Sequence, residues 1–460
     1  MSSSFSGQIV VVGGGISGLS AAYDLGRCNI PHTIIEKRPR LGGVIETRKA
    51  GDCILEGGPD SFISQKPEAL ALIKDLGLEG DVIGSNDRTR ITYIVRRGRL
   101  VRLPEGVHMI VPSRAWPMVR TPLLGWGTKF RMALETLRRP EVRPDRSVAD
   151  FVVDHFGRET LDYLAEPLLA GVYGGDPAGM SVASVLPRFA EMEATHGSLV
   201  RAVLKNRRQS APGGAPLFRT LAGGLGKLVA KLSETVCFDR GEAETIERED
   251  GAFRVRMDGD WLRAAGVILA CPAWCASELV SALDPVLSAR LAEIPYTSSV
   301  TVSLGYLAAE FDGRRAGHGF LIPRKERHRM AACTFVTEKF SNRAPADLIV
   351  LRCFFGGAGD DAVLDESDET LIEMSRDELR RILGLTAAPV FTFISRWPRS
   401  MAQYTVGHAA RWKEIQSRAA AIPGLYLAGN GYTGIGIPDC IRMGRQAAKA
   451  IVSAAQPATS

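Results

Sequence analysis

The feature that most constrains the fold lies near the N-terminus, where a short apolar run ends in closely spaced glycines. The stretch VVVGGGISGLSAA contains the pattern Gly13-x-Gly15-x-x-Gly18. Its hydrophobic spacing predicts a strand over 8–12 and a helix over 16–26, joined by the glycine turn. Glycines at such a turn let the backbone pass close to a pyrophosphate, which the positive end of the helix attracts. The segment therefore predicts a dinucleotide site.

An acidic residue completes this unit. A second strand is predicted over 33–36, and it ends in Glu36, eighteen positions after Gly18. A carboxylate at this strand end accepts hydrogen bonds from ribose hydroxyls. Lys37 beside it would favour a 2′-phosphate, which an acidic residue at this place disfavours. A tight turn without a ligand would leave this combination of strand, helix and carboxylate unexplained.

Further glycine loops indicate FAD rather than NAD. Leu41-Gly42-Gly43 follows the acidic strand end and lets the chain wrap a long, extended cofactor. The loop Glu56-Gly57-Gly58-Pro59-Asp60-Ser61 exposes more backbone, which we expect beside the ribityl chain or the flavin ring. Near the C-terminus, Gly429-Asn430 and Gly434-Ile435-Gly436-Ile437 precede a predicted helix. Its N-terminus would stabilise the negative charge of a reduced flavin.

The composition is typical of a folded chain with two or three domains. Of its 460 residues, 45% are hydrophobic and 23% are charged, which is enough for a large core. The sequence shows no run of about 18 apolar residues and no basic, apolar leader, so we expect neither a spanning helix nor a secretory signal. The eight cysteines form no C-x-x-C pair and have no histidine at metal-ligand spacing. We therefore expect reduced thiols in a reducing compartment and no metal site.

Positive charge is concentrated in one part of the chain. The net charge is +6 at pH 7, yet residues 86–146 hold fourteen Lys and Arg against five Asp and Glu. No nucleic-acid recognition motif accompanies this excess, so we expect no nucleic-acid partner. Anionic lipid or an anionic substrate explains it better. The segment 109–139 adds Trp116 and Trp126, which predicts either docking on a bilayer or helices packed against the core.

Nucleotide elements occur at both ends of the chain and near its middle. We therefore predict an α/β (α+β) fold with a Rossmann-like FAD-binding domain assembled from discontinuous segments. The predicted segments of this domain are 1–85, 215–290 and 397–460. A mixed-sheet substrate-binding domain is expected from 86–105 and 291–396. A helical domain, open to membrane association, is expected over 106–214.

These motifs resemble the FAD-containing, monoamine-oxidase-like flavoprotein superfamily, and within it the protoporphyrinogen oxidase family. The resemblance covers essentially the whole chain. It rests on GGGISGL, RLGG, EGGPDSF, LAGVYGGDP, LAGGL, and RWPRSMAQYTVGH ahead of AGNGYTGIGIPDCI. QYTVGH and AGVYGGDP are the most specific of these. Asn430 stands where amine oxidases have Glu, which counts against amine oxidation. A desaturase of this superfamily would lack the QYxxGH stretch, which counts against desaturation.

The resemblance implies an FAD-dependent oxidoreductase of haem biosynthesis. It would oxidise protoporphyrinogen IX to protoporphyrin IX by hydride transfer to FAD in three two-electron steps, with molecular oxygen as acceptor and hydrogen peroxide as product. Coproporphyrinogen III oxidation to coproporphyrin III is one alternative, and an amine oxidase or desaturase of the same fold is another. A cytoplasmic location is implied; peripheral contact with the inner face of the cell membrane and a homodimer stay open.

The motifs and the resemblance together assign the cofactor contacts. Ala243 stands where the family usually has Val, in a contact made through the backbone. Ala409 stands where the family sometimes has a flavin-contacting Trp, so that contact is not expected here. The predicted cofactor-binding residues are Gly13, Gly14, Gly15, Ile16, Ser17, Gly18, Glu36, Lys37, Gly42, Gly43, Val44, Gly58, Pro59, Asp60, Ser61, Ala243, Gly429, Ile435, Gly436 and Ile437.

The predicted substrate site is a dry, apolar slot for a flat tetrapyrrole. Gly171 and Gly174 would let backbone approach the ring, with carbonyl groups accepting from pyrrole N–H groups. Phe320, Leu321 and Phe354 would sandwich it, and ordinary core packing is the alternative for these three.

The propionates of the substrate need a cationic partner. Arg96 is the predicted one, with Arg90 a close rival and a solvated surface role the alternative for either. The electron-rich pyrroles assist hydride loss, so no protein base is required and none is assigned. His408 in QYTVGH is interpreted as a hydrogen-bonded structural residue.

Overall fold

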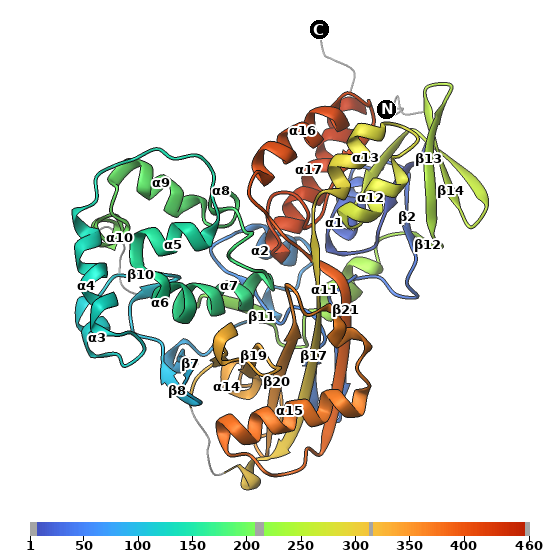
Figure 1. The fold of residues 1–460 in the computed structure, drawn as a ribbon. Helices are drawn as coiled ribbons and strands as arrows, with labels where there is room; N and C mark the ends of the chain where they lie inside the picture. The colour runs from blue at the N-terminus through green and yellow to red at the C-terminus, as the bar shows by residue number, and fades with distance from the viewer. Residues whose placement is uncertain (1–6, 208–215, 312–315, 456–460) are drawn as a thin grey trace.

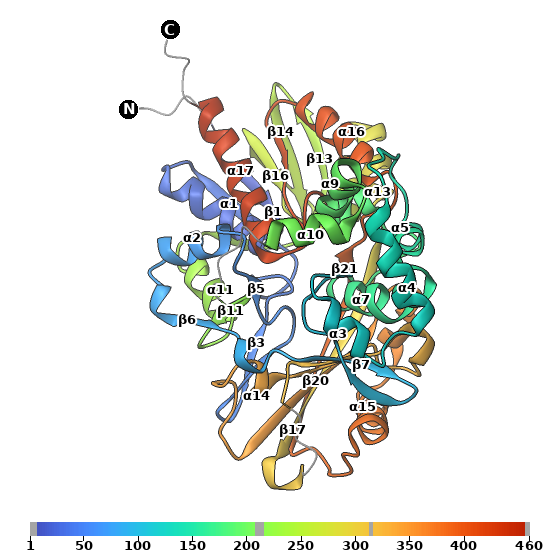
Figure 2. The same cartoon turned by 90° about the vertical axis from the view of Figure 1, so that its left-hand side faces the viewer.

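The computed structural model describes residues 7–207, 216–311 and 316–455, which form three connected regions (Figure 1). The first region is a parallel sheet flanked by helices, and both chain termini lie close to it. The second region is a larger mixed sheet beside the first. A lobe of helices projects to the left of both in Figure 1 and faces the viewer in Figure 2. The predicted mixed α/β fold is confirmed. The predicted domain boundaries at 214 and 215 lie outside the described residues.

The parallel sheet draws its strands from three separated stretches of the chain. In spatial order they are β12 (Phe238–Arg240), β2 (His32–Glu36), β1 (Ile9–Val12), β16 (Gly266–Leu269) and β22 (Leu425–Leu427). Every residue of β1 and β16 is buried and nearly all are aliphatic, as expected for parallel strands covered on both faces. The sheet is complete only when the N-terminal, middle and C-terminal stretches meet.

Helices and a small antiparallel sheet surround the parallel strands. The helices are α1 (Ile16–Arg27), α2 (Glu68–Asp75), α11 (Gly226–Ser233), α12 (Ala273–Leu279), α13 (Pro285–Ala292), α16 (His408–Ala420) and α17 (Ile437–Ala455). The antiparallel strands are β13 (Ala243–Glu249), β14 (Ala252–Met257) and β15 (Asp260–Ala264). Short strands near the glycine loops are β3 (Thr47–Ala50), β4 (Cys53–Glu56), β5 (Phe62–Ile63), β6 (Val82–Gly84) and β11 (Phe218–Leu221).

The mixed sheet has seven strands and a helix on one face. Their order is β21 (Phe391–Ala402), β17 (Tyr296–Leu307), β20 (Leu348–Gly356), β19 (Ala332–Phe335), β18 (Gly319–Leu321), β7 (Thr92–Arg96) and β8 (Arg99–Arg102). Only β18 and β7 pair in parallel. The helix α15 (Asp368–Leu383) packs Leu371 and Leu379 against Val300 and Val302 of β17, which closes a core on that face. The short helix α14 (Val336–Lys339) follows β19.

The helical lobe has its own apolar core, built around Phe151, Phe156 and Leu164. Its helices are α3 (Ala115–Arg120), α4 (Trp126–Leu134), α5 (Val148–Phe156), α6 (Arg158–Thr160), α7 (Glu166–Tyr173), α8 (Val182–Val185), α9 (Pro187–His196) and α10 (Leu199–Arg207), with a π-helical turn over Leu161–Ala165. Among the helices of the described residues, none is long and apolar enough to cross a bilayer.

Strands β7 and β8 form a hairpin rich in arginine. Between β7 and β8, Arg97 and Gly98 have φ values of 52° and 72°, the left-handed pair that a two-residue hairpin turn requires. The helix expected over 16–26 ends one residue later, at Arg27. Hydrophobic spacing therefore places these elements to within a residue or two.

Helices α1 and α17 come from opposite ends of the chain and touch through their backbones beside the parallel sheet. A methyl group at Gly444 of α17 would lie 2.1 Å from the carbonyl oxygen of Ser17 in α1. Because both atoms belong to regular helices, neither can move alone. The absence of a side chain at Gly444 therefore sets the distance between α1 and α17.

We expect Gly444→Ala to lower the free energy of unfolding by about 1–3 kcal/mol, because the added methyl forces the two helices apart. Urea denaturation followed by circular dichroism measures this change. Gly127→Ala is the matched control, since a methyl there, also within a helix, meets no atom within 4 Å. Equal stability of the two variants would contradict the role given to Gly444.

Candidate cofactor and substrate site

The first glycine turn can form only without side chains. Gly13 has a φ of +105°, and a methyl group at Gly18 would lie 2.0 Å from the Gly13 carbonyl oxygen. L-residues with a side chain rarely adopt the first conformation, and the second contact is impossible for them. The turn thus brings the end of β1 directly under the N-terminus of α1.

Glu36 reaches back from the end of β2 to this turn. The N–H of Gly14 donates to Glu36 Oε2 over 2.7 Å, and the N–H of Arg38 donates to Oε1 over 2.8 Å. Glu36 is 9% exposed, and its carboxylate retains lone pairs for further donors. Lys37 instead donates to Glu242 at the surface over 2.6 Å, next to Ala243 at the start of β13. The surroundings of Glu36 therefore suit a hydroxyl-bearing ligand.

The N-terminus of α1 meets the requirements of a phosphate site. Gly15, its N-cap, offers no side-chain cap, and no acidic residue lies in the first turn. The first N–H groups of a helix have no partner within the helix, here those of Ile16, Ser17 and Gly18. A methyl group placed at Gly15 would meet no atom within 4 Å. Free donors that face open space fit the pyrophosphate of a dinucleotide.

The other predicted cofactor loops converge on this place. The N–H of Gly42 donates to the Gly14 carbonyl over 2.7 Å, and a methyl at Gly43 would lie 3.2 Å from the Cα of Gly15. A methyl at Gly58 would lie 1.8 Å from the carbonyl oxygen of Val44. Segments 42–44 and 57–58 are therefore stacked on the turn by backbone contact.

One face of the mixed sheet donates hydrogen bonds to the loop Glu56–Ser61. Three donors from three strands reach the carbonyl oxygen of Gly57: Thr301 Oγ1 of β17 over 3.0 Å, an Nη of Arg352 of β20 over 2.9 Å, and Trp397 Nε1 of β21 over 2.8 Å. In the same loop, Lys339 donates to both oxygens of Asp60 over 2.8 Å. Asp60 in turn accepts from the Ser61 hydroxyl. Side chains far away in the sequence thus fix this loop.

The QYTVGH segment supports the C-terminal glycine loop. The N–H of Gly434 donates to the Tyr404 hydroxyl over 2.7 Å, and that hydroxyl donates to the Asn430 carbonyl over 2.8 Å. The His408 ring stacks on Tyr404 at 4.1 Å between ring centroids, and its Nε2 lies 2.8 Å from the Tyr432 carbonyl. Burial lowers the pKa of His408, so its neutral form donates there. These contacts give His408 a structural role.

Gln403 of the same segment ties three regions together. Its Nε2 donates to the Tyr173 carbonyl at the end of α7 over 2.8 Å and to Thr297 Oγ1 of β17 over 3.1 Å. The next residue of the lobe, Gly174, has a φ of 57°, and its carbonyl accepts from the N–H of Ala358 over 2.8 Å. Gly174 therefore joins the lobe to the mixed sheet, while Ile435 to Ile437 lead into α17.

The three apolar residues predicted for the substrate separate onto two faces of the mixed sheet. Leu321 and Phe354 lie in one cross-strand row through Ala332, on the face that carries Arg352 and Thr301. A methyl at Gly171 of α7 would lie 3.1 Å from Leu321 Cδ2, so the lobe approaches the sheet at this point.

The prediction for Phe320 needs correction. Phe320 is 1% exposed and packs against Phe335 with the core residues that face α15. Neighbouring residues of a strand point to opposite faces, so Phe320 and Leu321 cannot both contact one flat ligand. Phe320 therefore makes a core contact, and we leave it out of the proposed substrate site.

Arg96, the predicted propionate partner, is already occupied. Its Nη2 donates to Glu159 over 2.8 Å, its Nη1 donates to the Leu123 carbonyl, and its guanidinium lies over the Tyr163 ring at 4.4 Å. These contacts tie the hairpin to the helical lobe. Arg96 would have to share its guanidinium with Glu159 to bind a propionate, and its role in substrate binding stays a prediction. Arg90 is exposed, with Asp87 at 3.7 Å as its ion-pair partner, and is the freer of the two cations.

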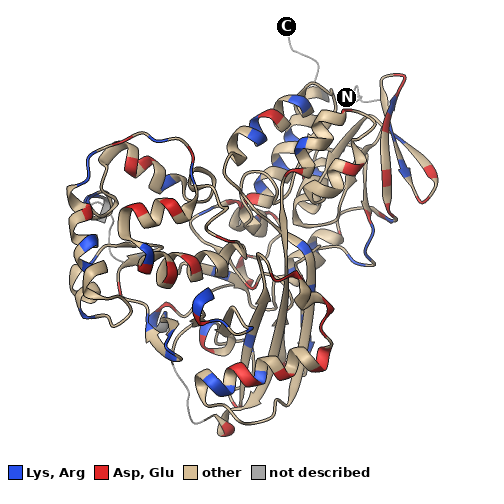
Figure 3. Ribbon diagram, in the orientation of Figure 1, with Lys and Arg blue, Asp and Glu red and all other residues tan. Residues whose placement is uncertain are grey.

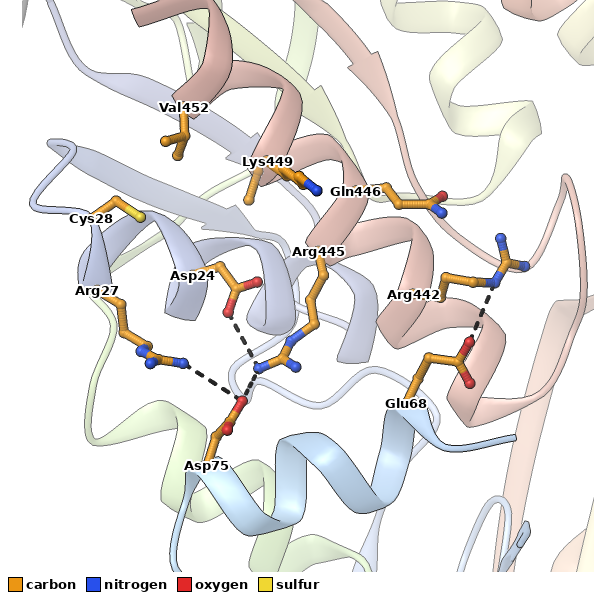
Figure 4. A pocket seen from close by; sticks show the side chains of 11 residues that line it. Asp24, Arg27, Cys28, Glu68, Asp75, Arg442, Arg445, Gln446, Lys449 and Val452 are labelled. Atoms are coloured by element: carbon orange, nitrogen blue, oxygen red, sulfur yellow. Dashed lines mark hydrogen bonds and ion pairs between the residues drawn. The ribbon is translucent and has the colours of Figure 1, made fainter. Parts of the chain in front are cut away.

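A hollow of about 520 Å³ lies elsewhere, between α1, α2 and α17 (Figure 4). Its charged side chains pair with one another: Arg445 with Asp24 at 3.4 Å and with Asp75, and Arg442 with Glu68 at 3.9 Å. None of the glycine loops lines it. The hollow is therefore separate from the candidate site.

Several residues of the site had no motif to identify them. Arg352 gives one signal, because it interrupts the otherwise apolar strand LIVLRCFF, where a charge needs a buried partner. Thr301, Trp397 and Lys339 give none. Their roles depend on strand register, which the sequence alone does not fix.

Gly15→Ala separates cofactor binding from folding. Gly15 has φ −69° and ψ 177°, which alanine adopts without strain, and its methyl would enter only open space. We expect the free energy of unfolding of the cofactor-free protein to change by less than about 1 kcal/mol. FAD affinity should fall at least about tenfold, or 1.4 kcal/mol, in a fluorescence titration. Gly80→Ala, also without neighbours within 4 Å, is the control; equal FAD affinity in the two variants would argue against this site.

Comparison with known proteins agrees with this arrangement. A profile of the family described as flavin containing amine oxidoreductase matches residues 16–452. The chain is 34% identical to the coproporphyrinogen III oxidase of Bacillus subtilis (strain 168), over 96% of this chain and 97% of the relative. It is 28% identical to the chloroplastic protoporphyrinogen oxidase 1 of Arabidopsis thaliana, over 94% and 85%.

A solved structure extends the similarity to three dimensions. The crystal structure of a protein from Exiguobacterium sp. 255-15, provisionally named a protoporphyrinogen oxidase, superimposes with a TM-score of 0.87 at 31% identity, over 98% of this chain and 99% of that one. The match thus covers both sheets and the helical lobe. The chain belongs to the flavin containing amine oxidoreductase family and, within it, to the porphyrinogen oxidases, which use FAD.

Proposed function

We propose that the chain oxidises coproporphyrinogen III to coproporphyrin III, with protoporphyrinogen IX as the second candidate substrate. The family resemblance implies protoporphyrinogen IX, with coproporphyrinogen III as the alternative. The relatives from Bacillus subtilis and Staphylococcus aureus, at 34% and 30% identity, are named coproporphyrinogen III oxidases, which supports the reversed order. The plant relative, at 28%, supports the second candidate. Either reaction belongs to haem biosynthesis.

One structural observation carries the proposal. The face of the mixed sheet that holds the loop Glu56–Ser61 is the face that presents Leu321 and Phe354. The apolar side chains therefore adjoin the loop predicted to lie at the flavin. Gly171 of α7 packs against Leu321, so the lobe meets the sheet here with no side chain on the helix side. We propose that the flat substrate binds beside this contact.

In the proposed mechanism the chain itself has two roles, which are to bind the cofactor and to orient the substrate. When bound, FAD supplies the redox chemistry: it takes up two electrons in each of three rounds and returns them to molecular oxygen, which yields hydrogen peroxide. The chain holds the cofactor with the glycine loops and Glu36, and it orients the substrate in a site shielded from water. We propose segments 1–85, 215–290 and 397–460 as the FAD-binding domain, 86–105 and 291–396 as the substrate domain, and 106–214 as the helical domain.

No strong base is required, and the tyrosines near the site do not provide one. Burial raises the pKa of Tyr173 to about 12 and the pKa of Tyr404 well above its ordinary value. Both stay protonated at neutral pH, and the Tyr404 hydroxyl donates to the Asn430 carbonyl. The protons that the pyrrole N–H groups lose are assigned to no protein base.

The test is an assay with both substrates. Purified, FAD-loaded protein mixed in air with coproporphyrinogen III should generate porphyrin fluorescence at least about 10²-fold faster than autoxidation, with kcat/KM above that for protoporphyrinogen IX. Hydrogen peroxide should accumulate at three molecules per porphyrin, and removal of oxygen should stop turnover. Failure with both porphyrinogens contradicts the function; a preference for protoporphyrinogen IX contradicts the proposed order.

We also propose that the helical lobe contacts the inner face of the cell membrane. Along α3, α4 and the turn after it, the large apolar side chains are exposed: Trp116 67%, Trp126 72%, Phe130 66% and Leu137 73%. Arg120 lies over the Trp116 ring at 5.5 Å, and Lys129 lies over the Trp126 ring at 4.6 Å. Basic residues also mark this edge of the lobe (Figure 3). Tryptophan beside basic groups suits an anionic bilayer interface.

Vesicle sedimentation tests this contact. The protein should sediment with vesicles that contain phosphatidylserine and much less with phosphatidylcholine alone, because both apolar and basic groups contribute. Trp116→Ser with Trp126→Ser should weaken binding at least about tenfold. Trp261→Ser is the control, since Trp261 is also exposed and stacked under Arg254 at 4.3 Å but lies on β15. Equal vesicle binding by the double variant and by Trp261→Ser would contradict the proposed membrane contact.

A further inference from the structure

Beneath the loop Glu56–Ser61 lies a group of buried charges that the proposed mechanism does not use. Arg352 is 3% exposed and donates to the Gly57 carbonyl over 2.9 Å and to the Gly58 carbonyl over 2.5 Å. Its Nε has no partner among the described residues. Behind it, the side chains of Lys339 and Asp60 form an ion pair at 2.8 Å that is 12% and 19% exposed. Burial of such charges costs free energy, which indicates that they have a function.

The clamp on Gly57 orients one peptide group. The Gly57 carbonyl points toward the sheet, where Thr301, Arg352 and Trp397 donate to it. In a planar trans peptide the N–H is directed opposite to the carbonyl, so the N–H of Gly58 points away from the sheet. Among the residues that the structure describes, none accepts a hydrogen bond from it. The clamp therefore presents a free donor on the side of the loop that faces away from the sheet.

The loop lies on the path between the two helix N-termini. At one end Gly58 packs on Val44, whose neighbour Gly43 packs on Gly15 at the start of α1. At the other end, Lys66 forms an ion pair of 2.5 Å with Asp439 in the first turn of α17. A cofactor that follows these segments from α1 to α17 would therefore lie beside the free N–H of Gly58.

The buried group carries unbalanced positive charge. It contains three cations, Lys339, Arg343 and Arg352, and two carboxylates, Glu56 and Asp60, which leaves an excess of one. Burial would raise the pKa of Asp60, but Lys339 and Arg352 hold it well below its ordinary value, so Asp60 is ionised. Burial raises the pKa of Glu56, which can only increase the excess. Charges act strongly over distance in such a weakly polarisable interior.

We propose that Arg352 is a positioning residue for the flavin ring: it fixes the Gly57–Gly58 peptide with its N–H toward the cofactor and supplies the unbalanced positive charge that makes bound flavin easier to reduce. The inference rests on the flavin site proposed above. Reduction adds negative charge to the ring, so a fixed donor and a buried cation nearby stabilise the reduced form.

The reduction potential of bound FAD tests the electrostatic role. Each FAD-loaded variant is equilibrated anaerobically with a reference dye during slow reduction. Arg352→Met should shift the two-electron equilibrium about tenfold against reduced flavin, which corresponds to roughly 30 mV. Asp60→Asn removes a negative charge without changing size, and it should shift the equilibrium in the opposite direction. A loss of structure alone would not give opposite signs.

Two further variants separate charge from geometry. Arg352→Lys keeps the charge but cannot bridge two carbonyl groups, so we expect a potential close to that of the unmodified protein with FAD affinity about tenfold weaker. Arg396→Met is the matched control. Arg396 lies on β21 of the same sheet and donates to the carbonyls of Leu364 and Glu366, but on the face that carries α15. We expect it to lower stability and leave the potential unchanged.

The proposal is overturned if Arg352→Met shifts the potential no more than Arg396→Met, or if Arg352→Met and Asp60→Asn shift it in the same direction. Should Arg352→Met not fold, Asp60→Asn and Arg352→Lys decide: the proposal requires a shift toward reduced flavin in Asp60→Asn and an unshifted potential in Arg352→Lys, and it is overturned if Asp60→Asn shows no such shift. These readouts are independent of turnover. Porphyrinogen oxidation with unshifted potentials contradicts only this inference, whereas the expected shifts without oxidation contradict only the proposed function.

Discussion

Around the N-terminus of α1, the chain brings backbone segments so close together that no side chain fits between them. A methyl group at Gly18 would lie 2.0 Å from the Gly13 carbonyl, and one at Gly58 would lie 1.8 Å from that of Val44. Segments from the first sixty residues can stack here only because glycines occupy these contacts. The donors of α1, the carboxylate of Glu36 and the loop Glu56–Ser61 consequently face one region.

The mixed sheet uses its two faces for different purposes. On one face, Val300 and Val302 pack with Phe320 against α15 and stabilise the domain. The other face carries Thr301, Arg352 and Trp397, whose donors converge on a single carbonyl. Because strand residues alternate between faces, a shift of one residue in register would exchange these two sets. The packing on α15 thus specifies which side chains reach the cofactor loop.

The QYTVGH segment connects parts of the site that are formed by different regions. Gln403 joins α7 to β17, while Tyr404 and His408 hold the loop before α17. Gln403, Tyr404 and His408 are buried and hydrogen-bond mainly to backbone carbonyls, an arrangement that rigidifies a site more than it catalyses. The sequence motif is therefore explained by positioning of the lobe and the glycine loop, with no proton transfer assigned to His408.

The sequence by itself determined the βαβ unit, the three glycine-bearing stretches and the family. These depend on short-range rules: hydrophobic period, backbone angles open only to glycine, and a carboxylate at fixed spacing. The tertiary structure decided which side chains meet. Phe320 faces α15, and Arg96 is bound by Glu159. Arg352 reaches Gly57 although the two residues are 295 positions apart in the sequence. Such outcomes follow from strand register and from competition between charged partners, and both are set by contacts between segments far apart in the chain.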